Sequence, residues 1–373
     1  MNIKWYGPIL NTSGYAKANR DYIYALLFHE KTNIKIGEHK FIACEKSKED
    51  YYNFPIYKQL VKNDIDYNKV VYNCVPNQVQ YLIENDKKSI GISTWETNRI
   101  PDKWFDIINN KLDLQIVPSG YNADVYENCG IITPIKVIPH CIDTDYYQKE
   151  REPILPKELD DHYKFLSVFQ WTERKNPFCL LLSYLTEFKH NEKVVLILRV
   201  YGSNHSVSEQ KRILNEIKTH IHNLNIQKTP QIYFIGDQLN DDEMISLYNE
   251  CDCFVLPSRS EGFGLPILEA MACKKPVVST NHGAVKELII DNKNGFLIDS
   301  REYPVCNMRW INEYDAYQTW GDPDPMHLRY IMRFLYENVD TGINMGKYGE
   351  MIARNKYSYK VVGQQLYDAL KDI

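Results

Sequence analysis

The sequence predicts an α/β protein of two domains, each built around a parallel β-sheet that helices cover. Three observations lead to this class: the length of 373 residues, short apolar runs that alternate with helical segments, and a charged stretch near the middle of the chain. A chain of this length is typical of two domains. Strands that alternate with helices form parallel sheets. The charged stretch, residues 149–162, contains prolines and has no hydrophobic period, so we interpret it as the interdomain linker.

The composition indicates a globular protein and excludes some partners. Hydrophobic residues make up 44% of the chain and charged residues 25%, which are globular values. The formal net charge of −5 argues against a protein that binds nucleic acid by bulk charge. Nine scattered cysteines without a CxxC pair favour reduced thiols in the cytoplasm. No signal peptide follows Met1 and no apolar run reaches about 20 residues, so we expect a cytoplasmic protein. Peripheral contact with a membrane stays open.

Strand and helix signals alternate through the first half of the chain. Apolar runs predict strands at residues 3–6, 34–36, 70–72, 89–95, 113–117 and 136–138. Helical segments are expected at residues 15–28, 57–61 and 120–129. A loop with Ser13 and Gly14 joins the first strand to the first helix, and its backbone N–H groups could bind a phosphate. The other interpretation of this loop is an ordinary turn.

The second half repeats the pattern. Strands are expected at residues 164–169, 193–200, 232–235, 254–256, 276–280 and 296–298, with helices between them at 176–188, 206–224 and 241–249. Arg199 lies at the carboxyl end of its strand, hence near the edge where such sheets bind ligands. Residues 300–325 look irregular and aromatic, which fits a lid or a partner surface equally well. Helices are expected to close the chain, at residues 326–338, 341–356 and 359–370.

The second half is organised around residues 255–298, where a strand, a glycine loop and a helix follow one another. Pro266 suits the first position of that helix, and a helix start after a glycine loop can hold a phosphate. We place Glu269 in the first turn, where its carboxylate can bind a ribose diol. Glu261 lies in the loop, on the strand-end side of the sheet. Ordinary capping by the helix dipole is the alternative for these glutamates.

Glu261 and Glu269 stand eight positions apart within SRSEGFGLPILEAMA, which resembles the E-x7-E motif of the retaining glycosyltransferases of family 4. The resemblance covers the chain in order and is strong only over residues 164–298. It implies a GT-B fold, with two Rossmann-like domains that face across a cleft. It also implies transfer of a sugar from a nucleotide diphosphate sugar, UDP- or GDP-linked, to an acceptor hydroxyl, with retention and without a metal or cofactor.

The resemblance assigns roles to several residues of the second domain. Glu269 would bind the ribose, and Glu261 would be a catalytic residue at the sugar. Lys175 matches a lysine that neutralises the donor diphosphate, and Arg174 either replaces the charge lost at Gln170, where the family has arginine, or points to solvent. The backbone of the loop would approach the sugar and phosphates, at Gly262, Phe263, Gly264 and Leu265.

In the first domain the resemblance is one of placement more than of residues. Glu96 stands where the family has a histidine near the transferred sugar, so it would be catalytic; a surface glutamate is equally compatible. His140 lies in PHCID, a segment similar to the family's hinge, and is either catalytic or structural. Ser13 and Gly14 replace a family Gly-Gly pair that faces the diphosphate.

The expected organisation is an acceptor-binding domain at residues 1–155, a nucleotide-sugar-binding domain at 156–345, and C-terminal helices at 346–373, the last of which crosses back to the first domain. The acceptor, whether a glycan, a lipid or a protein-linked sugar, stays open. Two alternatives share the donor site: a nucleotide-sugar epimerase or hydrolase, and a non-catalytic sugar-nucleotide-binding subunit.

Overall fold

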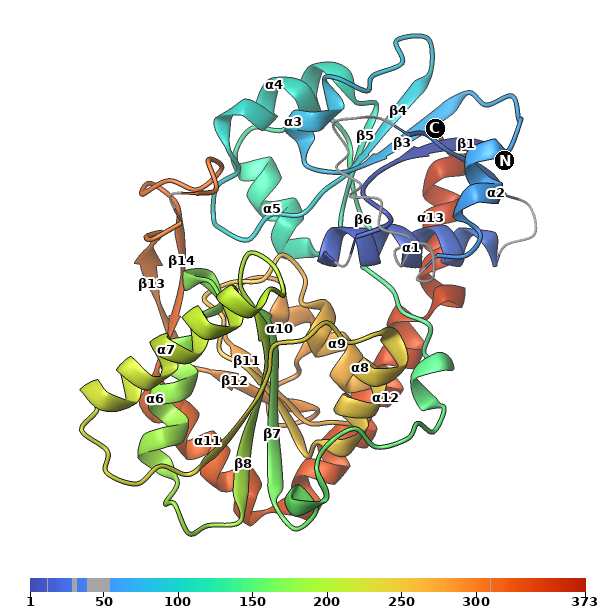
Figure 1. Ribbon diagram of the computed structural model, residues 1–373. Coiled ribbons are helices and arrows are strands. Elements are labelled where there is room, and N and C mark those ends of the chain that lie inside the picture. Colours follow the sequence, from blue (N-terminus) through green and yellow to red (C-terminus); the bar gives the residue numbers. More distant parts are fainter. Residues whose placement is uncertain (12, 29–31, 39–53, 309) are drawn as a thin grey trace. The chain divides into compact units, whose positions relative to one another are not determined.

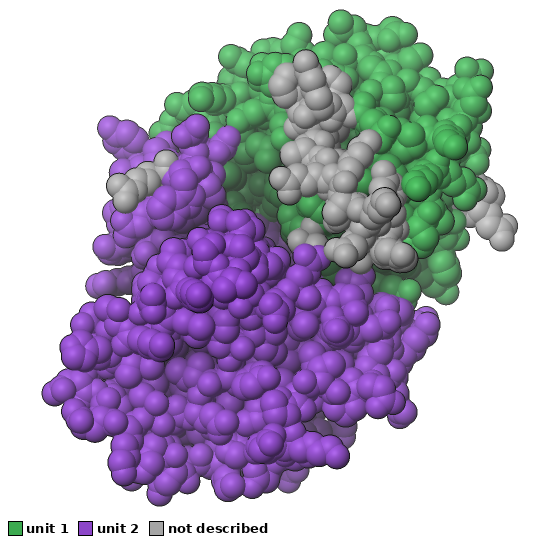
Figure 2. Space-filling view, in the orientation of Figure 1, with its two compact units in different colours: residues 1–144, 354–373 green, residues 145–353 purple. Residues whose placement is uncertain are grey.

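The computed structural model describes residues 1–11, 13–28, 32–38, 54–308 and 310–373 (Figure 1). Cys44 lies outside these residues. The described chain forms two compact units: unit 1 contains residues 1–144 and 354–373, and unit 2 contains residues 145–353 (Figure 2). Each unit holds one six-stranded parallel sheet, which confirms the predicted α/β class. The domain boundaries expected at 155/156 and 345/346 stay predictions, and residues 149–162 lie within unit 2.

The sheet of unit 1 has the strand order β2-β1-β3-β4-β5-β6, and all neighbours are parallel. Its strands are β1 (Asn2–Tyr6), β2 (Asn33–Ile36), β3 (Lys69–Asn73), β4 (Lys88–Ile92), β5 (Leu114–Val117) and β6 (Ile135–Val137). Its first five helices are α1 (Gly14–Leu27), α2 (Tyr57–Lys62), α3 (Pro76–Val79), α4 (Asp102–Lys111) and α5 (Gly120–Asn128). Every residue of β3 and β5 is buried, as expected for inner strands covered on both faces.

The last helix, α13 (Tyr359–Lys371), packs against α1 within unit 1 (Figure 1). Its apolar side chains Val362, Leu366 and Leu370 belong to the same core cluster as the strands of that unit. The buried Lys69 amine donates hydrogen bonds to the carbonyl oxygens of Leu370, at 2.5 Å, and Lys371, at 3.2 Å. These bonds satisfy two of the carbonyl groups that a helix leaves without partners at its C-terminus.

The sheet of unit 2 has the order β12-β11-β10-β7-β8-β9 and is also parallel. Its strands are β7 (Tyr163–Gln170), β8 (Val194–Tyr201), β9 (Gln231–Ile235), β10 (Cys253–Leu256), β11 (Val277–Thr280) and β12 (Gly295–Ile298). Its helices are α6 (Pro177–Glu187), α7 (Val207–Asn223), α8 (Asp241–Glu250), α9 (Leu265–Ala272), α10 (Val285–Leu288), α11 (Pro325–Glu337) and α12 (Val339–Tyr357). The last four residues of α12, 354–357, belong to unit 1. None of the helices in the described ranges is both long and apolar enough to cross a membrane.

Residues 300–325 are more regular than the sequence suggests. β13 (Ser300–Pro304) and β14 (Thr319–Pro323) form an antiparallel ribbon, and their connection folds over a small core of Val305, Met308 and Trp320. The expectation of an irregular segment was wrong because β13 is exposed along most of its length and so shows no apolar run.

Candidate functional site

The candidate site of unit 2 lies where its sheet changes direction. From β7 the chain adds β8 and β9 on one side, and from β10 it adds β11 and β12 on the other. The loops after β7 and β10 therefore leave neighbouring strands in opposite directions, and open α/β sheets bind ligands at such a point. The loop after β7 carries a 3₁₀ turn, Glu173–Lys175, and the loop after β10 carries Glu261.

The structure brings three of the predicted site residues together between these loops. The Lys175 amine donates a hydrogen bond to Glu261 Oε1 at 2.6 Å, and Arg174 Nη1 lies 3.5 Å from Glu261 Oε2. Glu261 is 5% exposed and Lys175 9% exposed. Burial alone would raise the pKa of Glu261, but the charges of Lys175 and Arg174 outweigh it and hold that pKa below its ordinary value. Glu261 is therefore an ionised, buried carboxylate at neutral pH.

Arginines fix the two loops to each other. Arg174 Nη1 donates to the Ser260 carbonyl oxygen at 2.8 Å, and the Arg259 amide donates to the Arg174 carbonyl oxygen at 2.7 Å. The Arg259 side chain forms ion pairs with Glu173, at 2.8 Å, and with Asp322 of β14, at 3.3 Å. The β13–β14 ribbon is thus tied to the same loops that hold Glu261.

Helix α9 begins directly after the glycine loop. Gly264 is its N-cap and has a φ of 104°, a conformation that residues with a Cβ rarely adopt. Pro266 lies in the first turn, where its missing N–H is not needed. Phe263 and Leu265 are buried, so the loop from Gly262 onward is packed in place. Pro266 has no N–H, and the Ile267 and Leu268 amides donate to the Gly264 carbonyl oxygen, so an anion at this start would be favoured mainly by the positive end of the helix dipole.

Glu269 lies in the second turn of α9, not in the first turn as the sequence suggested, because the helix begins at Leu265. Its Oε2 accepts a hydrogen bond from the Tyr248 hydroxyl of α8 at 2.8 Å. Burial, with the nearby Glu269 carboxylate, raises the pKa of Tyr248 well above its ordinary value, so the hydroxyl stays a donor. Sequence reasoning missed Tyr248: its spacing matches the buried face of α8, and nothing local connects it to Glu269.

The remaining predicted site residues belong to unit 1. Ser13 is the N-cap of α1, where its Oγ accepts a hydrogen bond from the Ala16 amide at 3.2 Å and donates to Asn11 Oδ1 at 2.6 Å. A Cβ added to Gly14 would meet no atom within 4 Å, so packing does not require glycine there. This loop follows β1, beside the point where the unit 1 sheet also reverses, between β1 and β3.

Glu96 and His140 have different surroundings within unit 1. Glu96 is half-buried in the loop after β4, in electrostatic contact with Tyr15 and Tyr126. His140 is buried, and its Nδ1 lies 3.1 Å from the Tyr22 hydroxyl. The Tyr22 hydroxyl hydrogen is used on the Ile138 carbonyl oxygen, so Nδ1 must donate. Burial lowers the pKa of His140 to about 3, which keeps the imidazole neutral at physiological pH.

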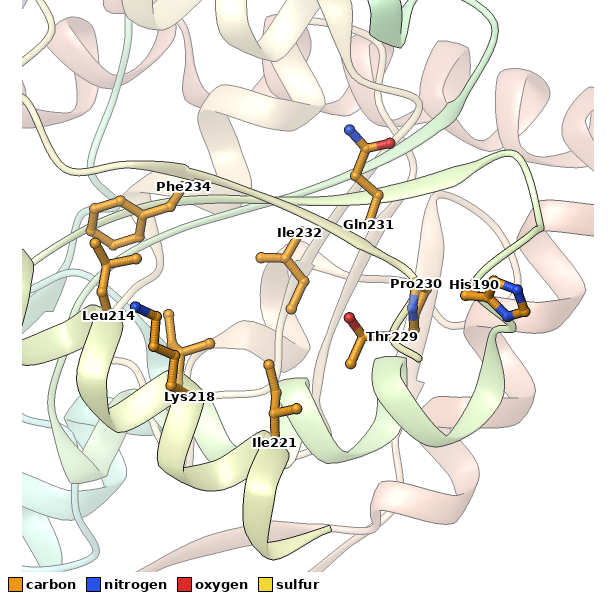
Figure 3. Close-up of a pocket in the computed structure, with 10 residues that line it drawn as sticks. His190, Leu214, Lys218, Ile221, Thr229, Pro230, Gln231, Ile232 and Phe234 are labelled. Carbon is orange, nitrogen blue, oxygen red and sulfur yellow. The ribbon is translucent and has the colours of Figure 1, made fainter. Parts of the chain in front are cut away.

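A cavity of about 460 Å³ lies elsewhere in unit 2, between α7 and β9 (Figure 3). His190 and Thr229, which line it, precede β8 and β9. The cavity therefore extends toward the amino ends of the strands, away from the loops after β7 and β10. Within the ranges that the structure describes, no three His, Cys, Asp or Glu side chains gather as a metal site.

Comparison with known proteins identifies the fold class first. The two parallel six-stranded sheets form a GT-B fold, and the structure matches the crystal structure of Anabaena HepE in complex with UDP and glucose over 100% of both chains. The TM-score is 0.69 and the sequence identity 16%, so this similarity concerns the fold alone.

The sequence comparisons are more specific. Residues 149–304 match the family model for glycosyl transferases group 1. An uncharacterized glycosyltransferase of Methanocaldococcus jannaschii is 48% identical over 84 residues, 22% of this chain and 24% of that protein. The alpha-1,3/1,6-mannosyltransferase of Dictyostelium discoideum is 23% identical over 74% of this chain and 65% of its own length. The chain thus spans less than two thirds of these relatives. The matches support the group 1 glycosyltransferase family.

Proposed function

We propose that this protein is a retaining glycosyltransferase of family 4 that moves a sugar from a nucleotide diphosphate sugar to an acceptor hydroxyl. The observation that carries the proposal is the buried Lys175–Glu261 contact at the reversal of the unit 2 sheet, beside the start of α9. An ionised carboxylate and two cations there match a ligand that has both sugar hydroxyls and phosphates. The structural neighbour HepE is in complex with UDP and glucose, which supports a UDP-linked donor; GDP is the other candidate.

Each group has a role in this proposal. Glu269, oriented by Tyr248, binds the ribose hydroxyls. Lys175, Arg174 and the positive end of the α9 dipole bind the diphosphate and stabilise the charge that develops on it as it leaves. Because these groups supply positive charge, the transfer needs no metal. Glu261 holds the sugar and stabilises positive charge at the anomeric carbon.

The transfer exchanges one bond for another. The bond between the anomeric carbon and the diphosphate oxygen breaks, and its electron pair stays on that oxygen. The acceptor hydroxyl attacks the same face of the sugar, and its proton passes to the leaving phosphate oxygen. Retention follows from this geometry. In unit 1, Glu96 and His140 would act at the sugar, and the Ser13–Gly14 loop would approach the diphosphate.

A thermal-shift panel of UDP-, GDP- and ADP-sugars tests the donor assignment. A donor at 100 times its Kd stabilises the protein by about 2.7 kcal/mol, which is measurable. Glu269→Ala should lose the shift, whereas Glu337→Ala, an exposed glutamate of α11, should keep it. An equal shift in both variants would contradict the ribose assignment.

The reaction is then tested with the donor that binds. Glycan, lipid and sugar acceptors are screened, and NMR of the product reports its anomeric configuration. An inverted product would reject the retaining mechanism. Hydrolysis or epimerisation that proceeds without acceptor would identify the other enzyme class, and binding without turnover across a broad acceptor set would indicate a non-catalytic subunit.

A further inference from the structure

Arg199 is a buried cation that the roles assigned above do not use. It lies on β8 and is only 6% exposed, and its Nε has no hydrogen-bond partner among the residues that the structure describes. Within the described part of the chain, no carboxylate forms an ion pair with it. Its guanidinium carbon lies 5.7 Å from the centre of the Tyr201 ring.

The position of Arg199 connects it with the candidate site. In the sheet register it stands opposite Val168, two residues before the end of β7, and Tyr201 stands opposite Gln170. Alternate residues of a strand share a face, so Arg199 and Tyr201 point to the same side of the sheet. The guanidinium also interacts electrostatically with Tyr248, the residue that orients Glu269. Arg199 therefore belongs to the face of the sheet that α8 covers.

An arginine in this position is costly to the protein without a ligand. Guanidinium groups stay protonated in proteins, and burying a charge without a counter-ion is unfavourable. Its tyrosine neighbours do not compensate for it, because burial raises the pKa of Tyr201 and of Tyr248 and keeps both neutral at physiological pH.

A shared neighbour connects Arg199 with the cations of the candidate site. Arg174 and Lys175 both contact Glu261, and the Tyr201 hydroxyl interacts electrostatically with Arg174 as well as with Arg199. Buried positive charge at the carboxyl edge of a sheet is suited to an anionic ligand.

We propose that Arg199 is a third cation of the nucleotide site and that its guanidinium binds a diphosphate oxygen of the donor. This inference rests on the proposed function. The diphosphate is chosen over the base or the ribose because only an anionic group compensates a buried guanidinium, and a planar guanidinium can donate two parallel hydrogen bonds to phosphate.

The test compares wild type with Arg199→Met by calorimetric titration with the nucleoside diphosphate and with the nucleoside of the same base. Loss of hydrogen bonds to a charged group should weaken diphosphate binding about 10- to 100-fold. Nucleoside affinity should change less than twofold. Arg301→Met is the matched control, since its side chain is 78% exposed, and it should leave both affinities unchanged.

The melting temperature of the ligand-free protein separates binding from a structural role. Because Arg199→Met removes a charge that has no counter-ion, the free variant should melt at or above the temperature of wild type. A lower melting temperature would mean that Arg199 stabilises the fold, and would overturn the proposal. An Arg199→Met variant that fails to fold would also count against the proposal. Arg199→Lys keeps the charge but loses the two parallel N–H donors of the guanidinium. This variant should bind the diphosphate about fivefold more weakly than wild type.

The remaining outcomes are equally distinct. An equal loss for nucleoside and diphosphate would place Arg199 at the base or ribose and overturn the diphosphate assignment. Unchanged diphosphate binding in Arg199→Met would overturn it as well. If wild type itself binds no nucleoside diphosphate from a uridine, guanosine and adenosine panel, the proposed function fails, and this inference fails with it.

Discussion

At the scale of single residues, the buried Lys175–Glu261 contact should be sensitive to the loss of either partner. Lys175→Met leaves a buried carboxylate without its main partner, and breaking a buried pair in this way costs about 3–5 kcal/mol. We expect this loss in the free energy of unfolding measured with urea at pH 7. Lys175→Met combined with Glu261→Gln removes both charges and should recover most of it. A double variant as unstable as the single one would show that the charge pair is not the cause.

The same carboxylate gives a pH dependence with a defined sign. Its pKa in the folded protein is below the ordinary 4.5, so the ionised form stabilises the fold above pH 4.5. This contribution should disappear as the pH falls from 4.5 through the lower folded value. Urea unfolding between pH 3 and 7 should therefore fall less steeply for Glu261→Gln than for wild type. Parallel curves would contradict the lowered pKa.

In the proposed function, Tyr248 positions Glu269 for the ribose of the donor. Tyr248→Phe removes the 2.8 Å hydrogen bond to Oε2 but keeps the ring, so α8 should stay packed. Because ribose binding serves ground state and transition state alike, KM for the donor should rise about threefold to tenfold with little change in kcat. Tyr348→Phe, on the exposed part of α12, is the control. A fall in kcat at constant KM would reject this role.

At the scale of elements, two glycines at helix starts make a matched pair. Gly264 has a φ of 104°, and an added Cβ would lie 3.1 Å from Ile267 Cδ1, so Gly264→Ala should destabilise the protein by about 1–3 kcal/mol. Gly14, where a Cβ meets open space, should accept alanine at no cost. Chemical denaturation measures both. Equal stability losses would contradict the assigned backbone conformations.

A fall in donor affinity for Gly14→Ala without loss of stability would support a ligand at the loop after β1. If donor affinity does not change, capping of α1 by Ser13, which accepts a hydrogen bond from the Ala16 amide, would be the only role left for this loop.

Helix α13 is part of the unit 1 core, so its buried side chains should matter for stability. Leu366 is fully buried in the cluster that also contains strand residues such as Val71 and Ile90. Leu366→Ala should cost about 2–5 kcal/mol in urea unfolding, and Gln364→Ala, on the exposed face, less than 0.5 kcal/mol. Similar small effects for both would mean that the helix is dispensable.

The elements that sequence alone predicted are those with a strong local pattern. Strands β8 and β10 are continuous apolar runs, and α7 repeats isoleucines at every fourth position, so both kinds of element were evident. The β13 strand was missed because exposed strands have no such run. Glu261 and Lys175 were found through a motif, but their contact joins residues 86 positions apart, which no local pattern reveals. The Tyr248–Glu269 bond is non-local for the same reason, as is the lack of a counter-ion for Arg199 within the described ranges.

At the scale of the whole molecule, the proposed function divides the work between the two units. The groups proposed for donor binding cluster in unit 2, at the loops after β7 and β10 and on α9, whereas Glu96 belongs to unit 1. If Glu96 acts only on the reacting sugar, its loss should affect the chemical step and not the affinity for the nucleotide.

Glu96→Gln should therefore lower kcat about 10²- to 10³-fold, since it removes charge stabilisation in the transition state, while the Kd for the nucleoside diphosphate stays within twofold of wild type. Lys175→Met should, by contrast, strongly raise the Kd for the nucleoside diphosphate. Steady-state kinetics and titration calorimetry on the intact chain measure the two quantities. A Glu96→Gln variant with normal turnover would make Glu96 a surface glutamate, and one with weakened nucleotide binding would mean that unit 1 contributes directly to holding the nucleotide.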